Sequence, residues 1–319
     1  MTILIAGVGY IGAPLALEYL ARGESVVGLE NYFCTRPDEL AALRKHSNFR
    51  LVRGSVSSEK ALDATFADGP FQAIHLLAAQ PSSSPKAAPA RYTEETNLIG
   101  ARMLLDRASA SGAARVVFGS SFHVYGAPLT GCVDETRPLG SFSDLSHLSK
   151  IYVEKLLEMY TRSSDISGVS VRLGIVYGLG PVMKSDPLFI TVPNLFARRA
   201  AQGQPLRLNP TATAAMAFLH VEDAVSALLA ACELQSRYAD ANAVSEALSV
   251  SQVALAVRDA ASDRGLNVHI EPEPRPGDPT APFTVCSRLQ TVGWTPNERL
   301  RDRVGEVIDY AQSGAWADR

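Results

Sequence analysis

A glycine-rich turn near the amino terminus constrains the fold more than any other feature. The run Gly7-Val8-Gly9-Tyr10-Ile11-Gly12 follows an apolar segment, residues 3–6, and precedes a helical pattern, residues 14–20. In such a strand, turn and helix, the first glycine permits a tight turn, the second lets the backbone approach a pyrophosphate, and the third lets helix and strand pack closely. The sequence therefore predicts a dinucleotide site contacted by Gly7, Gly9, Tyr10, Ile11 and Gly12.

A carboxylate at the end of the next apolar segment strengthens this prediction. Glu30 closes the segment of residues 25–29, where its side chain can accept hydrogen bonds from both ribose hydroxyls. The alternative is a surface acid. A carboxylate here would repel a 2′-phosphate, and no arginine follows Glu30 immediately, although Arg36 lies further along the loop. The predicted cofactor is therefore NAD rather than NADP.

Short apolar runs alternate with longer helical patterns through the first half of the 319 residues. Runs buried on both faces by crossover helices are typical of a parallel sheet, so we expect an α/β fold with a doubly wound (Rossmann) sheet and a smaller carboxy-terminal substrate lobe. The expected NAD-binding domain covers residues 1–177, and the substrate lobe covers residues 178–319. A strand and helix cap predict that residues 217–235 return to the first domain. The expected strands are residues 3–6, 25–29, 50–52, 73–79, 115–118 and 170–173.

Composition excludes several classes of partner. The formal net charge of -3 offers no general attraction for nucleic acid, and no apolar run reaches the roughly 18 residues of a membrane helix. The amino terminus carries no basic leader, so a cytoplasmic protein is expected. The cysteines are far apart and form no CxxC pair, which disfavours a zinc site, or any other metal site, and a disulfide framework. They are Cys34, Cys132, Cys232 and Cys286.

Further motifs follow the glycine turn in a recognisable order. They include Glu30-Asn31-Tyr32-Phe33, Leu77-Ala78-Ala79-Gln80, Asn97-Leu98-Ile99-Gly100, Ser120-Ser121-Phe122-His123-Val124-Tyr125-Gly126, Val176-Tyr177-Gly178 and His220-Val221-Glu222-Asp223. With these motifs the chain resembles the extended short-chain dehydrogenase/reductases, which include nucleotide-sugar epimerases and dehydratases. The resemblance implies further cofactor contacts at Asn31, Ser55, Val56, Leu77, Ala78, Ala79, Lys150 and Val176.

The resemblance also implies a catalytic tyrosine four residues before the ribose-binding lysine. Lys150 is present, but Ser146 stands at the tyrosine position, and no tyrosine in the chain has a lysine four residues later. A serine hydroxyl is too weak an acid to replace a phenol unaided. Ser121 matches the serine or threonine that bonds the reacting oxygen. We therefore expect atypical acid/base chemistry carried by Ser121, by Ser146 with a water, or by His123.

The histidines and the substrate contacts leave alternatives open. His123 lies on a turn expected to face the substrate, where it either binds substrate or relays a proton, or is purely structural. His147 is rotated about 100° from position 146 on a helix, so packing or solvent exposure is expected for it. Ile175 and Met216 stand where the family commonly has polar contacts to a sugar nucleotide, whereas Arg275 resembles a diphosphate-binding arginine.

Three functions are compatible with these patterns. The first is an NAD-dependent epimerase, dehydratase or oxidoreductase acting on a nucleotide sugar. The second is a dehydrogenase or reductase of a small non-nucleotide compound, and the third is an inactive NAD-binding scaffold or regulator. The resemblance further implies a homodimer that pairs through two helices, near residues 98–110 and 146–160.

Overall fold

The computed structural model describes residues 1–82, 84, 86–142, 144–209, 214–273 and 283–316. Its centre is a seven-stranded sheet whose neighbouring strands all run parallel, in the order β11-β7-β5-β4-β1-β2-β3. This confirms the predicted doubly wound sheet. The strands are β1 (Thr2–Ala6), β2 (Ser25–Glu30), β3 (Phe49–Arg53), β4 (Ala73–Leu76), β5 (Arg115–Ser121), β7 (Ser167–Leu173) and β11 (Tyr238–Ala243).

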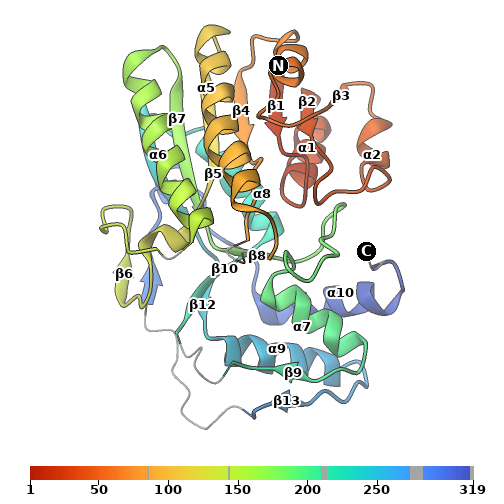
Figure 1. Ribbon diagram of the computed structural model, residues 1–319. Helices are drawn as coiled ribbons and strands as arrows, with labels where there is room; N and C mark the ends of the chain where they lie inside the picture. The colour runs from red at the N-terminus through yellow and green to blue at the C-terminus, as the bar shows by residue number, and fades with distance from the viewer. Residues whose placement is uncertain (83, 85, 143, 210–213, 274–282, 317–319) are drawn as a thin grey trace.

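Helices cover both faces of this sheet (Figure 1). Alternate residues of one strand enter different cores: Ile3 and Ile5 pack with α1 (Gly12–Ala21) and α8 (Val221–Ala231), whereas Leu4 packs on the opposite face. The opposite face is covered by α3 (Glu59–Phe66), α5 (Ala101–Ala110) and α6 (Leu145–Ser163). Burial on both sides explains why β1 is a continuous apolar run. The short elements α2 (Ala41–Arg44), α4 (Ala90–Thr93), the π-helix η1 (Glu94–Gly100) and the 3-10 helix η2 (Phe122–Tyr125) complete this part.

The carboxy-terminal part groups three helices, α7 (Val192–Ala201), α9 (Val250–Ser262) and α10 (Leu300–Gln312), which pack on one another below the main sheet in Figure 1. Small sheets connect it to the rest. They pair β8 (Ile175–Tyr177), β10 (Met216–His220) and β12 (Glu246–Leu248); β9 (Leu206–Arg207) and β13 (Ile270–Glu271); and β6 (Gly131–Val133) and β14 (Phe283–Val285). The 3-10 helix η3 (Arg288–Val292) follows β14.

The segment expected to return to the first domain divides between two surroundings. Its strand, β10, pairs with β8 and β12 in a separate sheet, whereas its helix, α8, packs against β5, β7 and β11 of the main sheet. The strand that joins the main sheet is the next one, β11, which pairs with β7. The sequence did not predict β11, because its residues Tyr-Ala-Asp-Ala-Asn-Ala form no continuous apolar run.

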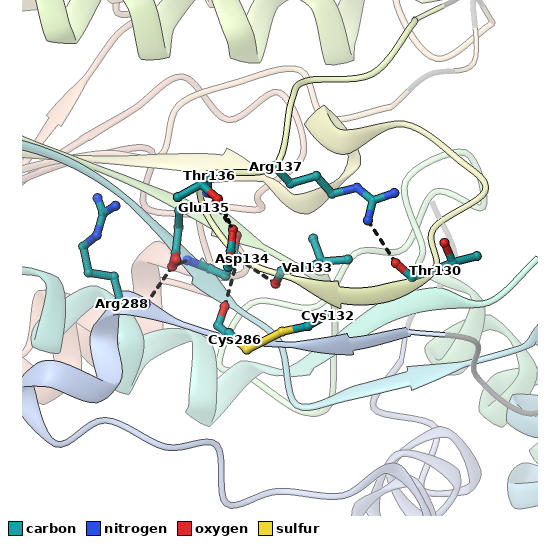
Figure 2. The surroundings of a disulfide bond; sticks show 10 residues. Thr130, Cys132, Val133, Asp134, Glu135, Thr136, Arg137, Cys286 and Arg288 are labelled. Atoms are coloured by element: carbon teal, nitrogen blue, oxygen red, sulfur yellow. Dashed lines mark hydrogen bonds between the residues drawn. A yellow bond between two sulfur atoms is a disulfide. The ribbon is translucent and has the colours of Figure 1, made fainter.

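The sequence disfavoured a disulfide framework, and the fold corrects this for one pair of cysteines. Cys132 and Cys286 form a disulfide between β6 and the residue after β14 (Figure 2). The two residues are 154 positions apart, so only the parallel pairing of these strands brings them together. A backbone hydrogen bond supports the pairing, since the Cys286 amide donates to the Val133 carbonyl oxygen at 3.1 Å.

Within the described residues, no helix is long and apolar enough to span a membrane.

Candidate active site

A cavity of about 430 Å³ opens at the carboxyl ends of the central strands. Ligands bind at this edge in open parallel sheets, where the loops after the strands diverge. The cavity brings together every predicted site residue that the structure describes; Arg275 lies outside the described residues. The predicted residues that line it are Gly7, Gly9, Tyr10, Ile11, Gly12, Glu30, Asn31, Ser55, Val56, Leu77, Ala78, Ala79, Ser121, His123, Ser146, Lys150 and Val176.

The glycine turn forms one wall, and its geometry requires glycine at two positions. Gly7 has φ of +97°, and a Cβ there would lie 2.6 Å from the backbone nitrogen of Ala78. A Cβ at Gly12 would lie 2.0 Å from the carbonyl oxygen of Gly7. A Cβ at Gly9 would instead meet only Thr35, at 3.4 Å, so this position leaves room for a ligand beside the backbone. The amino end of α1 therefore meets the cavity as an anion site requires.

Glu30 is the last residue of β2 and is 7% exposed. Its Oε1 accepts a hydrogen bond of 2.7 Å from the backbone amide of Tyr32. Burial raises the pKa of Glu30, while backbone amides of Tyr32, Asn31 and Val8 act in the opposite direction. Beside it, the Asn31 side chain donates to the hydroxyl of Tyr92 at 2.9 Å. The carboxylate is thus held at the cavity wall, where ribose hydroxyls can reach it.

Lys150 and Ser121 lie at the other end of the cavity. Lys150 Nζ donates to the carbonyl oxygen of Gly119 at 2.9 Å, and burial lowers the pKa of Lys150 to about 8. Ser121 ends β5, and its Oγ is 3.3 Å from Nδ1 of His123. Ser146 also lines the cavity, but its Oγ donates to the carbonyl oxygen of Gln80 at 3.1 Å. The hydroxyl at the expected tyrosine position is therefore already bonded to the backbone.

His147, for which packing or solvent exposure was expected, also lines the cavity. Its ring stacks on His123 with centroids 4.8 Å apart and an interplanar angle of 23°. Its Nδ1 is 2.6 Å from Oδ2 of Asp144, the residue that caps α6. Neighbouring side chains on a helix are rotated by about 100° from each other, yet Ser146 and His147, both in the first turn of α6, line the cavity.

The site includes residues that sequence reasoning did not select. Asp144 could have been found, because an aspartate three residues before a histidine at a helix start is both a cap and a side-chain partner. Lys184 had no such signal. It lies in the segment between β8 and α7, and its Nζ is 5.5 Å from the Tyr10 ring centroid. Phe33, Cys34, Thr35, Tyr92 and residues 188–191 also line the cavity.

The comparisons with known proteins agree with this geometry. The sequence model of the NAD dependent epimerase/dehydratase family matches residues 3–243. This chain belongs to that family.

Similar members are 25–27% identical in sequence. UDP-glucose 4-epimerase 3 of Oryza sativa subsp. japonica is 26% identical over 98% of this chain and 90% of its own length. UDP-glucuronic acid decarboxylase 1 of Arabidopsis thaliana is 27% identical over 72% of this chain and 51% of its own. The crystal structure of the Thermus thermophilus UDP-glucose 4-epimerase, a complex with NAD, is 25% identical, covers 98% of this chain and 99% of that chain, and has a TM-score of 0.81.

Family membership confirms NAD as the cofactor and an enzyme of the epimerase/dehydratase type. The residues present fit this cofactor. The open side of Gly9 leaves space for a pyrophosphate, Glu30 offers a carboxylate to a ribose, and Lys150 lies at the far end where the nicotinamide ribose would be held.

Proposed function

We propose that this chain is an NAD-dependent epimerase, dehydratase or oxidoreductase that acts on a nucleotide sugar and uses acid/base residues other than tyrosine. One observation carries the proposal: Lys150, Ser121 and two stacked histidines meet at one end of the cavity, while Ser146 replaces the phenol. Bound NAD supplies a reversible hydride acceptor. The relatives named after UDP-glucose and UDP-glucuronic acid support the substrate class.

The side chains of this chain then have separate tasks. Lys150 holds the cofactor ribose, and its positive charge stabilises negative charge developing on a nearby oxygen. The Ser121 hydroxyl hydrogen-bonds the reacting oxygen. Burial, with a smaller contribution from the charge of His147, lowers the pKa of His123 to about 4, so His123 is neutral near pH 7. In that state it keeps an acceptor and a donor available beside Ser121.

A smaller, non-nucleotide substrate is the second candidate, and Ile175 favours it. This apolar side chain lines the cavity at the position where the resemblance implies a polar contact to a sugar nucleotide. An apolar wall offers no hydrogen bond to a sugar hydroxyl.

One assay separates these candidates. The purified enzyme is incubated with NAD and a panel of UDP-sugars, UDP-uronic acids and small secondary alcohols. Nicotinamide absorbance and product masses are followed, and chromatography separates epimers, which have the same mass as their substrate. Conversion of at least one nucleotide sugar is expected. Conversion of small alcohols alone would establish the second candidate. No conversion with any substrate, despite NAD binding, would leave a scaffold as the function.

A further inference from the structure

We infer that His147, oriented by Asp144, is the catalytic acid/base that takes the place of the missing tyrosine. This inference rests on the proposed function, and it assigns the proton transfer to a pair of residues that the sequence motifs do not select. Its basis is that His147, held by Asp144 and stacked on His123, lines the same cavity as Ser121 and Lys150.

Asp144 fixes which nitrogen of His147 faces the reaction. Its Oδ1 accepts from the His147 backbone amide at 3.0 Å, and its Oδ2 lies 2.6 Å from Nδ1 of the same residue. A carboxylate can only accept, so Nδ1 carries a proton and Nε2 of the neutral ring is an acceptor. Within the described part of the chain, no protein group forms a hydrogen bond with His147 Nε2. The pair thus has the geometry in which an aspartate orients a catalytic histidine.

His147 suits this task better than His123. Among the described residues no carboxylate is hydrogen-bonded to His123, and burial lowers its pKa to about 4, which makes it a weak base near neutral pH. The Asp144 carboxylate, by contrast, stabilises the imidazolium that forms when His147 accepts a proton. The ring of His123 covers one face of His147 at 4.8 Å and limits its rotation. His123 is therefore a positioning residue for His147 and Ser121.

The proton transfer balances with the hydride transfer that bound NAD supports. As a secondary alcohol is oxidised, its O–H bond breaks and the proton forms a new bond with Nε2 of His147. The electron pair left on oxygen becomes the second C–O bond, while the carbon's hydride goes to the nicotinamide. In the reverse direction the protonated His147 returns its proton to the oxygen. Ser121 donates a hydrogen bond to that oxygen throughout.

The groups around His147 define a test by variants. Asp144 lies at the start of the same helix, His123 comes from η2, and Lys150 is one turn further along α6. His147→Gln should lower turnover by about 100-fold or more while NAD affinity stays within about twofold of wild type. Asp144→Asn should lower turnover by roughly tenfold or more by releasing the ring. The surface variant His46→Gln is the matched control.

Two further measurements distinguish catalysis from structure. Added imidazole should restore part of the activity of His147→Ala. Nitrogen-15 NMR of labelled histidine should show the proton on Nδ1 of neutral His147, and Asp144→Asn should abolish this preference. A proton on Nε2 would overturn the inference even without a known substrate.

The outcomes separate the two proposals. Wild-type turnover that survives in His147→Gln, together with loss of turnover in Ser121→Ala, would overturn the role of His147 and leave the proposed function standing. Absence of hydride transfer from every substrate of the panel in the wild type would overturn both.

Discussion

Ser146 and Gln80 are joined by a hydrogen bond of 3.1 Å from the serine hydroxyl to the backbone carbonyl oxygen. The same carbonyl accepts a bond from the Asn97 side chain at 3.1 Å, and Asn97 also donates to Ser149 at 2.9 Å. Ser146 is only 4% exposed. The first turn of α6 is therefore packed around a small side chain at the position where the family resemblance implies a phenol.

From this packing we expect Ser146→Tyr to lower turnover rather than restore it. The larger ring would displace the Ser146 contact and crowd the space where Ser121 and Lys150 meet, and overpacking of this kind costs about 1–3 kcal/mol of stability. Turnover of the true substrate and the melting temperature are measured for wild type, Ser146→Tyr and Ser121→Ala. Higher turnover in Ser146→Tyr would mean that the site merely lost its acid, and full activity in Ser121→Ala would remove Ser121 from the mechanism.

Glu30 should make the enzyme bind NAD more tightly than NADP. Its buried carboxylate can accept hydrogen bonds from ribose hydroxyls, and its negative charge repels a 2′-phosphate. Glu30→Ala should weaken NAD binding by roughly tenfold to 100-fold, the value of a charge-assisted hydrogen bond, and reduce the discrimination against NADP. Calorimetric titration of both cofactors against both proteins measures this. Equal affinity of the wild type for the two cofactors would contradict the assignment.

The exposed face of α6 should form a homodimer. Leu148, Tyr152 and Met159 are 53%, 40% and 52% exposed, and their spacing places them on one side of the helix. Ile99 of the preceding η1 is 44% exposed, and α5 packs beside α6 (Figure 1). Large apolar side chains gathered on one face are typical of a subunit interface.

Light scattering tests the dimer. The wild type should have twice the mass of one chain at micromolar concentration, and Met159→Glu should shift it to the monomer. Lys45→Glu, at an exposed lysine next to α2 and away from α6, controls for the added charge. A monomeric wild type would refute the interface.

The Cys132–Cys286 disulfide should stabilise the contact between β6 and β14. It closes a long loop, and such a bond typically contributes roughly 2–4 kcal/mol. A reducing agent should therefore lower the melting temperature of the wild type and leave that of Cys132→Ser unchanged. Mass spectrometry of the unreduced protein checks the bond directly. Free thiols at both positions, or a melting temperature insensitive to the reductant, would contradict this prediction.

The main sheet and the cofactor site could be predicted because their signals are local. Residues 3–6 and 25–29 are apolar runs, and the spacing of the glycines between them is enough to predict the backbone geometry of the turn. The edge strand β11 could not be predicted in this way, because small and polar residues alternate along it and its pairing with β7 depends on the rest of the fold. The disulfide depends on a strand pairing between distant segments in the same manner.

The end of the cavity that holds Ser121, His123 and His147 was also only partly predictable from local sequence. The angle between positions 146 and 147 follows from helix geometry, but which positions face the cavity depends on η2, which brings His123 against His147. Lys184 comes from a segment without periodicity, and only the fold places it beside Tyr10. Lys184 was therefore missed, whereas residues within local motifs, such as Ser121 at the end of β5, were found.

Lys184 provides the last prediction, because it is a partly buried cation beside the glycine turn. Its Nζ lies 5.5 Å from the Tyr10 ring centroid, and within the described residues it forms no ion pair with a carboxylate. Burial lowers the pKa of Lys184. A cation held at the cavity wall near Gly9 and the amino end of α1 is suited to binding a pyrophosphate. The negative charge of the pyrophosphate would compensate the loss of hydration that the lysine undergoes on burial.

Lys184→Met should therefore weaken NAD binding by roughly tenfold or more, since a hydrogen bond to a charged group contributes about 1.5–3 kcal/mol. Adenosine, which lacks phosphates, should bind the variant and the wild type equally. Lys45→Met, at an exposed lysine, is the matched control. Calorimetric titration with NAD and adenosine measures both affinities. An equal loss of affinity for both ligands would mean that Lys184 only supports the cavity wall. Unchanged NAD affinity would mean that its charge does not contact the pyrophosphate.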